Sequence, residues 1–291
     1  MDERTARALI ALNNRFYAEH AASFSATRQA PWAGWRRVIE EATALGAIGT
    51  ESTDAADADA PARPELHVLD LAAGNLRFER FLAEFLPATP LAIDALDRCD
   101  ALMAAAPGGN SSRVRVRTHH RDILEALLAG IGASDALAPR APYDLAVCFG
   151  FMHHVPTLAL RTRLLAALVR ALCPGGAAAV SFWQFMDDER LARKAARAEA
   201  AARAAAAAPG NLRGSTPAPA LGFSPAALEP GDHLLGWQDD PSAFRYCHHA
   251  SDAEIDALVA TLPVGTAREA ARFSADGASG ALNRYLILQR C

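Results

Sequence analysis

The stretch His67-Val-Leu-Asp-Leu-Ala-Ala-Gly-Asn-Leu-Arg77 decides the fold. It runs from an apolar strand ending near Asp70, through a turn of small residues, into the start of a helix. Small side chains let the backbone approach a ligand closely, and the first N–H groups of a helix lack partners within that helix. Open α/β sheets bind ligands at the carboxyl ends of their strands. We therefore expect Asp70, Ala72 and Gly74 to line a ligand site.

Short apolar runs and helical stretches alternate on the C-terminal side of this turn. The apolar runs predict strands at 66–71, 91–96, 114–119, 145–149 and 177–182. Helical spacing of apolar residues predicts helices at 78–85, 100–105, 123–128 and 158–172. Such an alternation favours an α/β fold, with a mostly parallel sheet covered by helices on both faces.

Acidic residues follow the next two predicted strands. Asp97 ends the second strand, where a carboxylate can accept hydrogen bonds from both hydroxyls of a ribose; Asp94 is the alternative. After the third strand, Asp122 offers an acceptor for an adenine amino group, and Ile123 offers an apolar surface for the ring. Phe149 ends the fourth strand at the same sheet edge. This order of residues predicts an adenosine site.

Together these motifs resemble the class I S-adenosylmethionine (SAM)-dependent methyltransferases over residues 66–184. The matching strings are VLDLAAGNLRF, ALDRCDALM, RDI, YDLAVCFGFMHHV and LVRALCPGGAAAVSFW. The resemblance implies a Rossmann-like sheet of seven strands with an antiparallel last strand, SAM as cofactor, S-adenosylhomocysteine (SAH) as product, and no metal. Ala72 and Leu76 depart from the family pattern, because they stand where its members often carry glycine.

The flanking segments resemble a narrower family, the eukaryotic tRNA wobble-uridine methyltransferases, which esterify 5-carboxymethyluridine. The strings are RFYAEHAASFSATRQAPW at 15–32, GW at 236–237, FRYCH at 244–248 and LNRY at 282–285. The resemblance implies that three N-terminal residues lie near SAM: Tyr17, Arg28 and Trp32. It also implies a substrate side formed by Trp183, Arg245, Tyr246, His248 and Asn283.

The acceptor chemistry has two alternatives. A carboxylate is ionised at neutral pH and needs no general base, and Arg245 would hold it by a bidentate pair. A hydroxyl or amine acceptor benefits from a base, for which His153 and His154 are the candidates. Each residue also has a structural interpretation: core packing for Trp32, a surface ion pair for Arg28, a satisfied turn for the histidines. A metal site needs at least a third ligand, and no such cluster stands out in the sequence.

The chain divides into four segments. Residues 1–64 form a helical cap, helical over 1–48, with a linker at 50–64. Residues 65–185 form the SAM-binding core, and 186–231 an alanine-rich helix (187–208) followed by a loop (209–231). Residues 232–291 complete the core with a helix at 252–262 and a strand at 285–289. The alanine-rich helix stands where a substrate lid would be inserted, although an inert solvated helix fits equally well.

Composition restricts the partners. The chain has 291 residues, 51% hydrophobic, with a formal net charge of −4 and five cysteines that form no CxxC motif. No strong global positive field attracts nucleic acid, although a local patch such as the arginines at 113, 115, 117 and 121 remains compatible with RNA. Neither a signal peptide nor a transmembrane run is visible, so we expect a cytoplasmic protein.

Three functions therefore remain open from the sequence. The first is a methyltransferase acting on tRNA, and the second is a methyltransferase acting on a small metabolite. The third is a catalytically silent SAM-binding protein; an NAD-binding protein would need a fuller G-x-G-x-x-G. The sequence does not identify an accessory protein partner.

Overall fold

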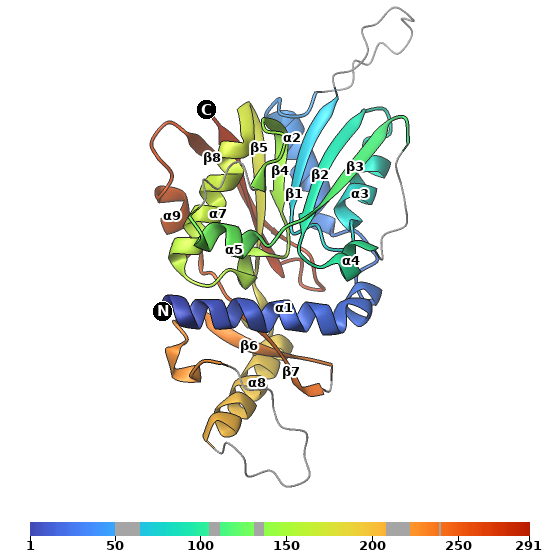
Figure 1. Cartoon of the computed structure of the whole chain (residues 1–291). Coiled ribbons are helices and arrows are strands. Elements are labelled where there is room, and N and C mark those ends of the chain that lie inside the picture. Colours follow the sequence, from blue (N-terminus) through green and yellow to red (C-terminus); the bar gives the residue numbers. More distant parts are fainter. Residues whose placement is uncertain (50–64, 105–110, 131–136, 208–221, 239) are drawn as a thin grey trace, which may run out of the picture.

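Seven strands form the central sheet, in the order β3-β2-β1-β4-β5-β9-β8 (Figure 1). The structure is a computed structural model that describes residues 1–49, 65–104, 111–130, 137–207, 222–238 and 240–291. The strands are β1 (Leu66–Leu71), β2 (Leu91–Asp97), β3 (Val114–His120), β4 (Tyr143–Cys148), β5 (Leu172–Trp183), β8 (Ala267–Ala275) and β9 (Asn283–Arg290). β1 to β5 pair in parallel, and β9 runs antiparallel to both β5 and β8. This topology confirms the predicted Rossmann-like fold.

Helices cover both faces of the sheet, which explains why β1 and β4 are buried along almost their whole length. One face packs against α5 (Ile123–Leu128), α7 (Leu158–Ala171) and α9 (Asp252–Ala260). The other face packs against α2 (Ala33–Ala44) and α3 (Arg77–Phe85). Because side chains alternate along a strand, Leu69 and Leu71 of β1 enter the first core and Val68 enters the second.

The predicted N-terminal helical region consists of two helices. α1 (Glu3–Ala26) begins after Asp2, whose side chain accepts a hydrogen bond from the Thr5 N–H, and α2 follows a break at 27–32. α1 crosses the edge of the sheet and separates it from the smaller sheet described below (Figure 1). The predicted linker at 50–64 lies outside the described residues.

A two-stranded antiparallel sheet lies beyond α1. β6 (Asp232–Trp237) pairs with β7 (Asp240–His248), and α8 (Glu189–Ala207) packs on β6. The alanine-rich prediction is confirmed as a helix, and its buried residues recur at helical spacing at Leu191, Ala195, Ala198 and Ala202. Of the predicted loop at 209–231, residues 209–221 lie outside the described residues. The short elements are α4 (Asp100–Ala104), η1 (Met152–His154), η2 (Phe185–Asp187) and η3 (Pro225–Ala227).

Of the arginines at 113, 115, 117 and 121, the last three are exposed and Arg113 is half-buried. Arg113 donates hydrogen bonds to the carbonyl oxygens of Ala83, Leu86 and Thr89, where it caps the C-terminal end of α3. Arg115 pairs with Glu65 at 2.6 Å. No helix within the described ranges is long and apolar enough to span a bilayer.

Candidate functional site

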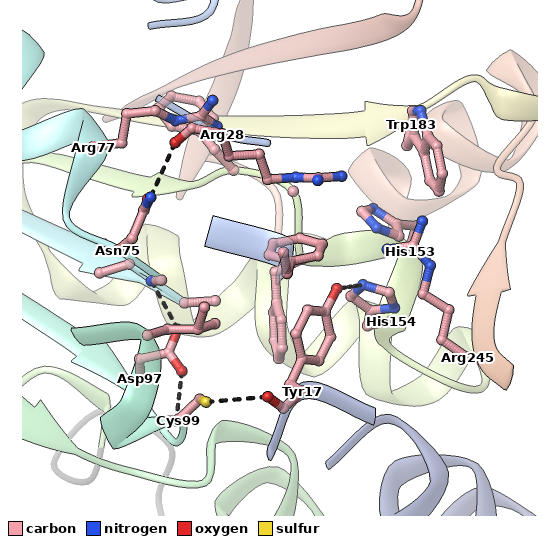
Figure 2. Close-up of a pocket in the computed structure, with 18 of the residues that line it drawn as sticks. Tyr17, Arg28, Asn75, Arg77, Asp97, Cys99, His153, His154, Trp183 and Arg245 are labelled. Carbon is pink, nitrogen blue, oxygen red and sulfur yellow. Dashed lines mark hydrogen bonds between the residues drawn. The ribbon is translucent and has the colours of Figure 1, made fainter. Parts of the chain in front are cut away.

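A cavity of about 900 Å³ opens at the carboxyl edge of the central sheet. Its walls come from the turns after β1, β2, β3 and β4, from the segment around the end of α1, and from β6, β7 and the β8–β9 connection. Figure 2 shows Asn75 and Asp97 at one end, with His153, His154, Trp183 and Arg245 at the other. The cavity therefore has one end built by the predicted cofactor motifs and another built by the flanking segments.

All ten residues predicted to bind the cofactor line this cavity. They are Tyr17, Arg28, Trp32, Asp70, Ala72, Gly74, Asp97, Asp122, Ile123 and Phe149. Trp183, Arg245 and Asn283 from the predicted substrate side line it too, as do His153 and His154. Tyr246 and His248 do not belong to the lining.

The turn after β1 has a left-handed backbone at Gly74 and also at two residues that are not glycine. Ala72 and Leu76 have φ angles of 65° and 53°, alongside 58° at Gly74. A side chain in the left-handed region costs about 1–2 kcal/mol. At both positions where this chain departs from the family pattern, the turn therefore carries backbone strain.

Asp97 is held in a fixed orientation at the tip of β2. One carboxylate oxygen accepts the Gly74 N–H at 2.8 Å, and the other accepts the Cys99 N–H at 2.7 Å. Each oxygen keeps a lone pair for a further donor, such as a ribose hydroxyl. The alternative, Asp94, is buried within the sheet, where it accepts from Tyr143 Oη at 3.0 Å and lies 2.8 Å from Nε2 of His119. Of the two carboxylates, the structure brings Asp97 to the cavity.

Asp122 and Ile123 form the next part of the wall. Asp122 is the N-cap of α5, where its side chain accepts the Glu125 N–H at 3.0 Å, and it pairs with Arg98 at 2.8 Å. Ile123 is 3% exposed, so it presents a rigid apolar surface beside that carboxylate. An acceptor next to an apolar surface matches the predicted adenine position.

The segment between α1 and α2 closes over the first turn. Asn75 donates hydrogen bonds to Ser25 Oγ at 3.1 Å and to the carbonyl oxygen of Arg28 at 3.0 Å. The guanidinium of Arg28 lies 3.7 Å from the centre of the Phe24 ring and points across the cavity in Figure 2. Burial and the nearby Arg245 lower the pKa of Arg28 to about 10, so it remains a cation at neutral pH. Asn75 was not predicted as a site residue, although it lies inside the first motif.

The two histidines after β4 have different environments. His154 uses both ring nitrogens: Nε2 lies 2.7 Å from Tyr17 Oη, and Nδ1 lies 2.8 Å from the carbonyl oxygen of Tyr246. Burial lowers its pKa to about 3. Nδ1 of His153 is buried without a hydrogen-bond partner among the described residues, and burial lowers its pKa well below the usual value. Of the two histidines, His153 is therefore the one with a ring nitrogen that no described residue engages, and its ring is uncharged at neutral pH.

The side chain of Arg245 extends from β7 and is surrounded by aromatic side chains. Its guanidinium lies between 5.3 and 6.0 Å from the ring centres of four residues: Phe16, Phe24, Trp183 and Trp237. The side chain is buried, and within the described chain its Nε has no hydrogen-bond partner. A buried guanidinium with an open donor is a strong site for an anion.

Tyr246 and His248, which were predicted for the substrate side, lie outside the cavity lining. Successive residues of a strand point to opposite faces, so Arg245 faces the cavity while Tyr246 and His248 face away. Both bond to Asp232, Tyr246 through its hydroxyl at 2.7 Å and His248 through Nδ1 at 2.8 Å. Nε2 of His248 lies 2.7 Å from Glu254, which in turn pairs with Arg161 at 2.8 Å. These residues join the small sheet to the core.

Asp276 was missed by the sequence analysis. It lines the cavity with φ 70° and accepts hydrogen bonds from Gly34 N–H at 2.9 Å, Asn283 Nδ2 at 2.8 Å and Tyr285 Oη at 2.6 Å. It thus fixes Asn283 and ties the start of α2 to the β8–β9 connection. Nothing in the local sequence distinguishes this aspartate from a surface turn residue.

One group of side chains, His153, His154 and Cys247, has the spacing of metal ligands, within 4.8 Å of one another. Its surroundings do not suit a cation. Both nitrogens of His154 are engaged, burial raises the pKa of the Cys247 thiol to about 12, and Arg245 adds a positive charge nearby. The group fits a buried polar cluster better than a metal centre.

The fold is shared with a solved methyltransferase structure. A SAM-dependent methyltransferase from Clostridium acetobutylicum is similar over 95% of this chain and 98% of its own, with a TM-score of 0.51 and 9% identity. This chain has a SAM-dependent methyltransferase fold. A second such enzyme, from Methanosarcina mazei, gives a TM-score of 0.48 and 15% identity over 78% of this chain and 93% of its own.

A third similar structure is that of an amino pentose methyltransferase from Micromonospora echinaspora with bound SAM. It gives a TM-score of 0.45 and 16% identity, over 93% of this chain and 95% of its own. No family model and no curated relative matches the sequence. At these identities the likeness to methyltransferases shows the fold alone.

Proposed function

We propose that this protein is a SAM-dependent methyltransferase that esterifies a carboxylate acceptor. The observation that carries the proposal is one cavity with two chemically distinct ends. One end has oriented carboxylates at three strand tips, Asp70, Asp97 and Asp122. The other end has two cations among aromatic rings, the half-buried Arg28 and the buried Arg245.

The first end fits SAM. Asp97, fixed by the N–H groups of Gly74 and Cys99, is positioned to accept both ribose hydroxyls. Asp122 and Ile123 would hold the adenine edge and face. Bound SAM supplies an electrophilic methyl group on a sulfonium, and it carries its own leaving group.

The second end fits an anion. Two guanidinium groups, those of Arg28 and Arg245, lie close enough for each to act on the charge of the other. An acceptor carboxylate would neutralise this repulsion and pair with the open donor of Arg245. The aromatic rings around both arginines favour a flat acceptor that can stack. Unlike a hydroxyl or an amine, a carboxylate acceptor requires no proton removal at neutral pH.

The residues then act by alignment and by exclusion of water. An in-line displacement needs the acceptor oxygen opposite the sulfur, and Arg245 would fix that oxygen from the β7 side. The closed segment around Arg28 and Trp32 keeps the transfer dry. His153, uncharged at neutral pH, would serve as base only for a hydroxyl or amine acceptor.

The flanking sequence strings support a carboxymethylated wobble uridine of tRNA as the acceptor. Its base is flat and its side chain ends in a carboxylate, which match the aromatic rings and Arg245. A small metabolite carrying a carboxylate offers the same chemistry. The net charge of −4 does not strengthen binding to a polyanion such as tRNA.

The decisive experiment uses SAM labelled in its methyl group, with total tRNA and a small-molecule extract as separate acceptor pools. A methyl ester is hydrolysed by mild alkali, so the transferred label should become volatile as methanol. If the label is found in the tRNA pool and becomes soluble after ribonuclease treatment, the acceptor is RNA. If the label is found only in the small-molecule extract, the acceptor is a metabolite. Alkali-stable label in both pools would contradict a carboxylate acceptor. Failure to bind SAM in calorimetry would contradict the methyltransferase itself.

A further inference from the structure

Glu79, which has no place in the proposed transfer, lies buried directly behind the cofactor end. It belongs to the first turn of α3 and is 3% exposed, as is Asp70 at the end of β1. Neither carboxyl oxygen of Glu79 receives a hydrogen bond from a donor in the described part of the chain. A buried carboxylate without donors is unstable as an anion and tends to bind a proton.

The partner of Glu79 is Asp70. The two carboxyl groups lie against each other, and a hydrogen bond between them requires a proton on one of the two. Asp70 lines the cavity, whereas Glu79 lies behind it. Of the two residues, only Asp70 can therefore contact a ligand in the cavity.

Other charged and titratable groups face the pair from three elements. Asp97 of β2 adds a negative charge, Arg80 of α3 adds a positive one, and Cys148 of β4 has a thiol whose pKa is raised by burial. One guanidinium nitrogen of Arg80 donates to the carbonyl oxygen of Asn75 at 2.8 Å. Burial raises the pKa of Glu79 to about 7, and burial together with Glu79 raises the pKa of Asp70 well above its usual value.

We propose that Asp70 and Glu79 share one proton in the ligand-free protein and release it when the ammonium group of SAM binds beside Asp70. This inference rests on the proposed function. The O–H bond of the pair breaks, the proton passes to solvent, and the bound ammonium becomes the hydrogen-bond donor to the ionised Asp70. Glu79 is thus a positioning residue that sets the protonation state of Asp70.

Titration calorimetry of SAM into the full chain tests this directly. At neutral pH, buffers with different ionisation enthalpies should reveal the release of about one proton per SAM bound. Because binding releases a proton, the affinity for SAM should increase as the pH rises. Below neutrality the increase should be up to about tenfold per pH unit. SAH carries the same ammonium group without the sulfonium charge, so it should release an equal amount. If a proton were released on binding of SAM but not on binding of SAH, the ammonium group could not be the cause of the release.

Glu79→Gln is the informative variant. Its amide can donate to Asp70, so Asp70 would ionise without a shared proton, and SAM binding should then show neither proton release nor dependence on pH. Glu84→Gln makes the same change at an exposed position of the same helix and should behave as the wild type.

Proton release that persists in Glu79→Gln would overturn the proposal. Wild-type binding of SAM whose heat is the same in every buffer would also overturn it, whether or not the variant folds. A wild-type chain that does not bind SAM at all contradicts the proposed function instead. The two failures are therefore distinguishable.

Discussion

Tyr17 Oη lies 2.7 Å from Nε2 of His154, and this contact joins α1 to the turn after β4 across the middle of the cavity. Since the other nitrogen of His154 lies 2.8 Å from the Tyr246 carbonyl oxygen, the ring has no nitrogen left for an acceptor. His154 therefore positions three segments of the site, and its neighbour His153 faces the ligand space.

Tyr17→Phe should lower stability by about 1–3 kcal/mol, because it removes the donor to the buried Nε2 of His154 and leaves the ring packing in place. Denaturant unfolding measures the loss. In a double-mutant cycle with His154→Gln, the two losses should be non-additive by about 1 kcal/mol. Additive losses would show that the contact carries no stability.

Arg245→Met should reduce kcat/KM for the acceptor by at least about 30-fold, since it removes a buried cation from the anion end. The Kd for SAM should change little, because the cofactor end is built by other residues. Arg245→Lys keeps the charge and should recover part of the activity. An equal loss of acceptor use and SAM binding would exclude the acceptor role of Arg245.

Leu76→Gly should stabilise the protein by about 0.5–1 kcal/mol, because glycine adopts the left-handed φ of 53° without strain. Leu76 lies at the N-cap of α3, where it makes no side-chain capping bond. Leu76→Ala is the matched control: it keeps the Cβ and should gain nothing. Thermal unfolding of the three proteins provides the comparison, and a destabilised glycine variant would contradict the strain.

Stability should fall as the pH rises above neutrality, because of His248. Burial disfavours its charged form, but the hydrogen bonds to Asp232 and Glu254 outweigh burial and raise its pKa. A folded-state pKa above the unfolded one gives a contribution that is complete below about pH 6.5 and is lost as pH passes through the folded pKa. Denaturant midpoints across this range should show the decline in the wild type.

His248→Gln should remove most of that pH dependence. The control His67→Gln changes an exposed histidine of β1 and should keep it. A decline of equal size in His248→Gln would assign the effect to another group.

Much of the fold could be predicted because buried parallel strands have a strong local signal. Runs such as Leu66–Leu71 and Leu91–Asp97 are mostly apolar, with an acidic residue at the end or next to it, and both lie within one residue of the predicted bounds. β8 was missed because its sequence, AREAARFSA, consists mainly of helix-forming residues on a half-exposed edge strand. β6 and β7 were missed because their pairing is set by contacts with α1 and α8 rather than by local pattern.

Some residues of the candidate site could be predicted from local sequence patterns, and others could not. Asp97 and Asp122 were predictable because strand ends in a parallel sheet meet at one edge. Tyr246 and His248 could be placed only once β7 was known to be a strand, whose alternation sends Arg245 alone to the cavity. Asp276 depends on a backbone with positive φ and on partners far away in sequence, which no local pattern reveals.

The position of β9 has a consequence for biosynthesis. It is the last strand of the sheet in sequence, yet it inserts between β5 and β8. During translation, β1 to β5 emerge early and can begin to pair, while β5 keeps an open edge until β9 leaves the ribosome. A nascent chain thus exposes the unpaired edge of β5 next to an incomplete cavity, and chaperone capture at β5 would be expected during that interval.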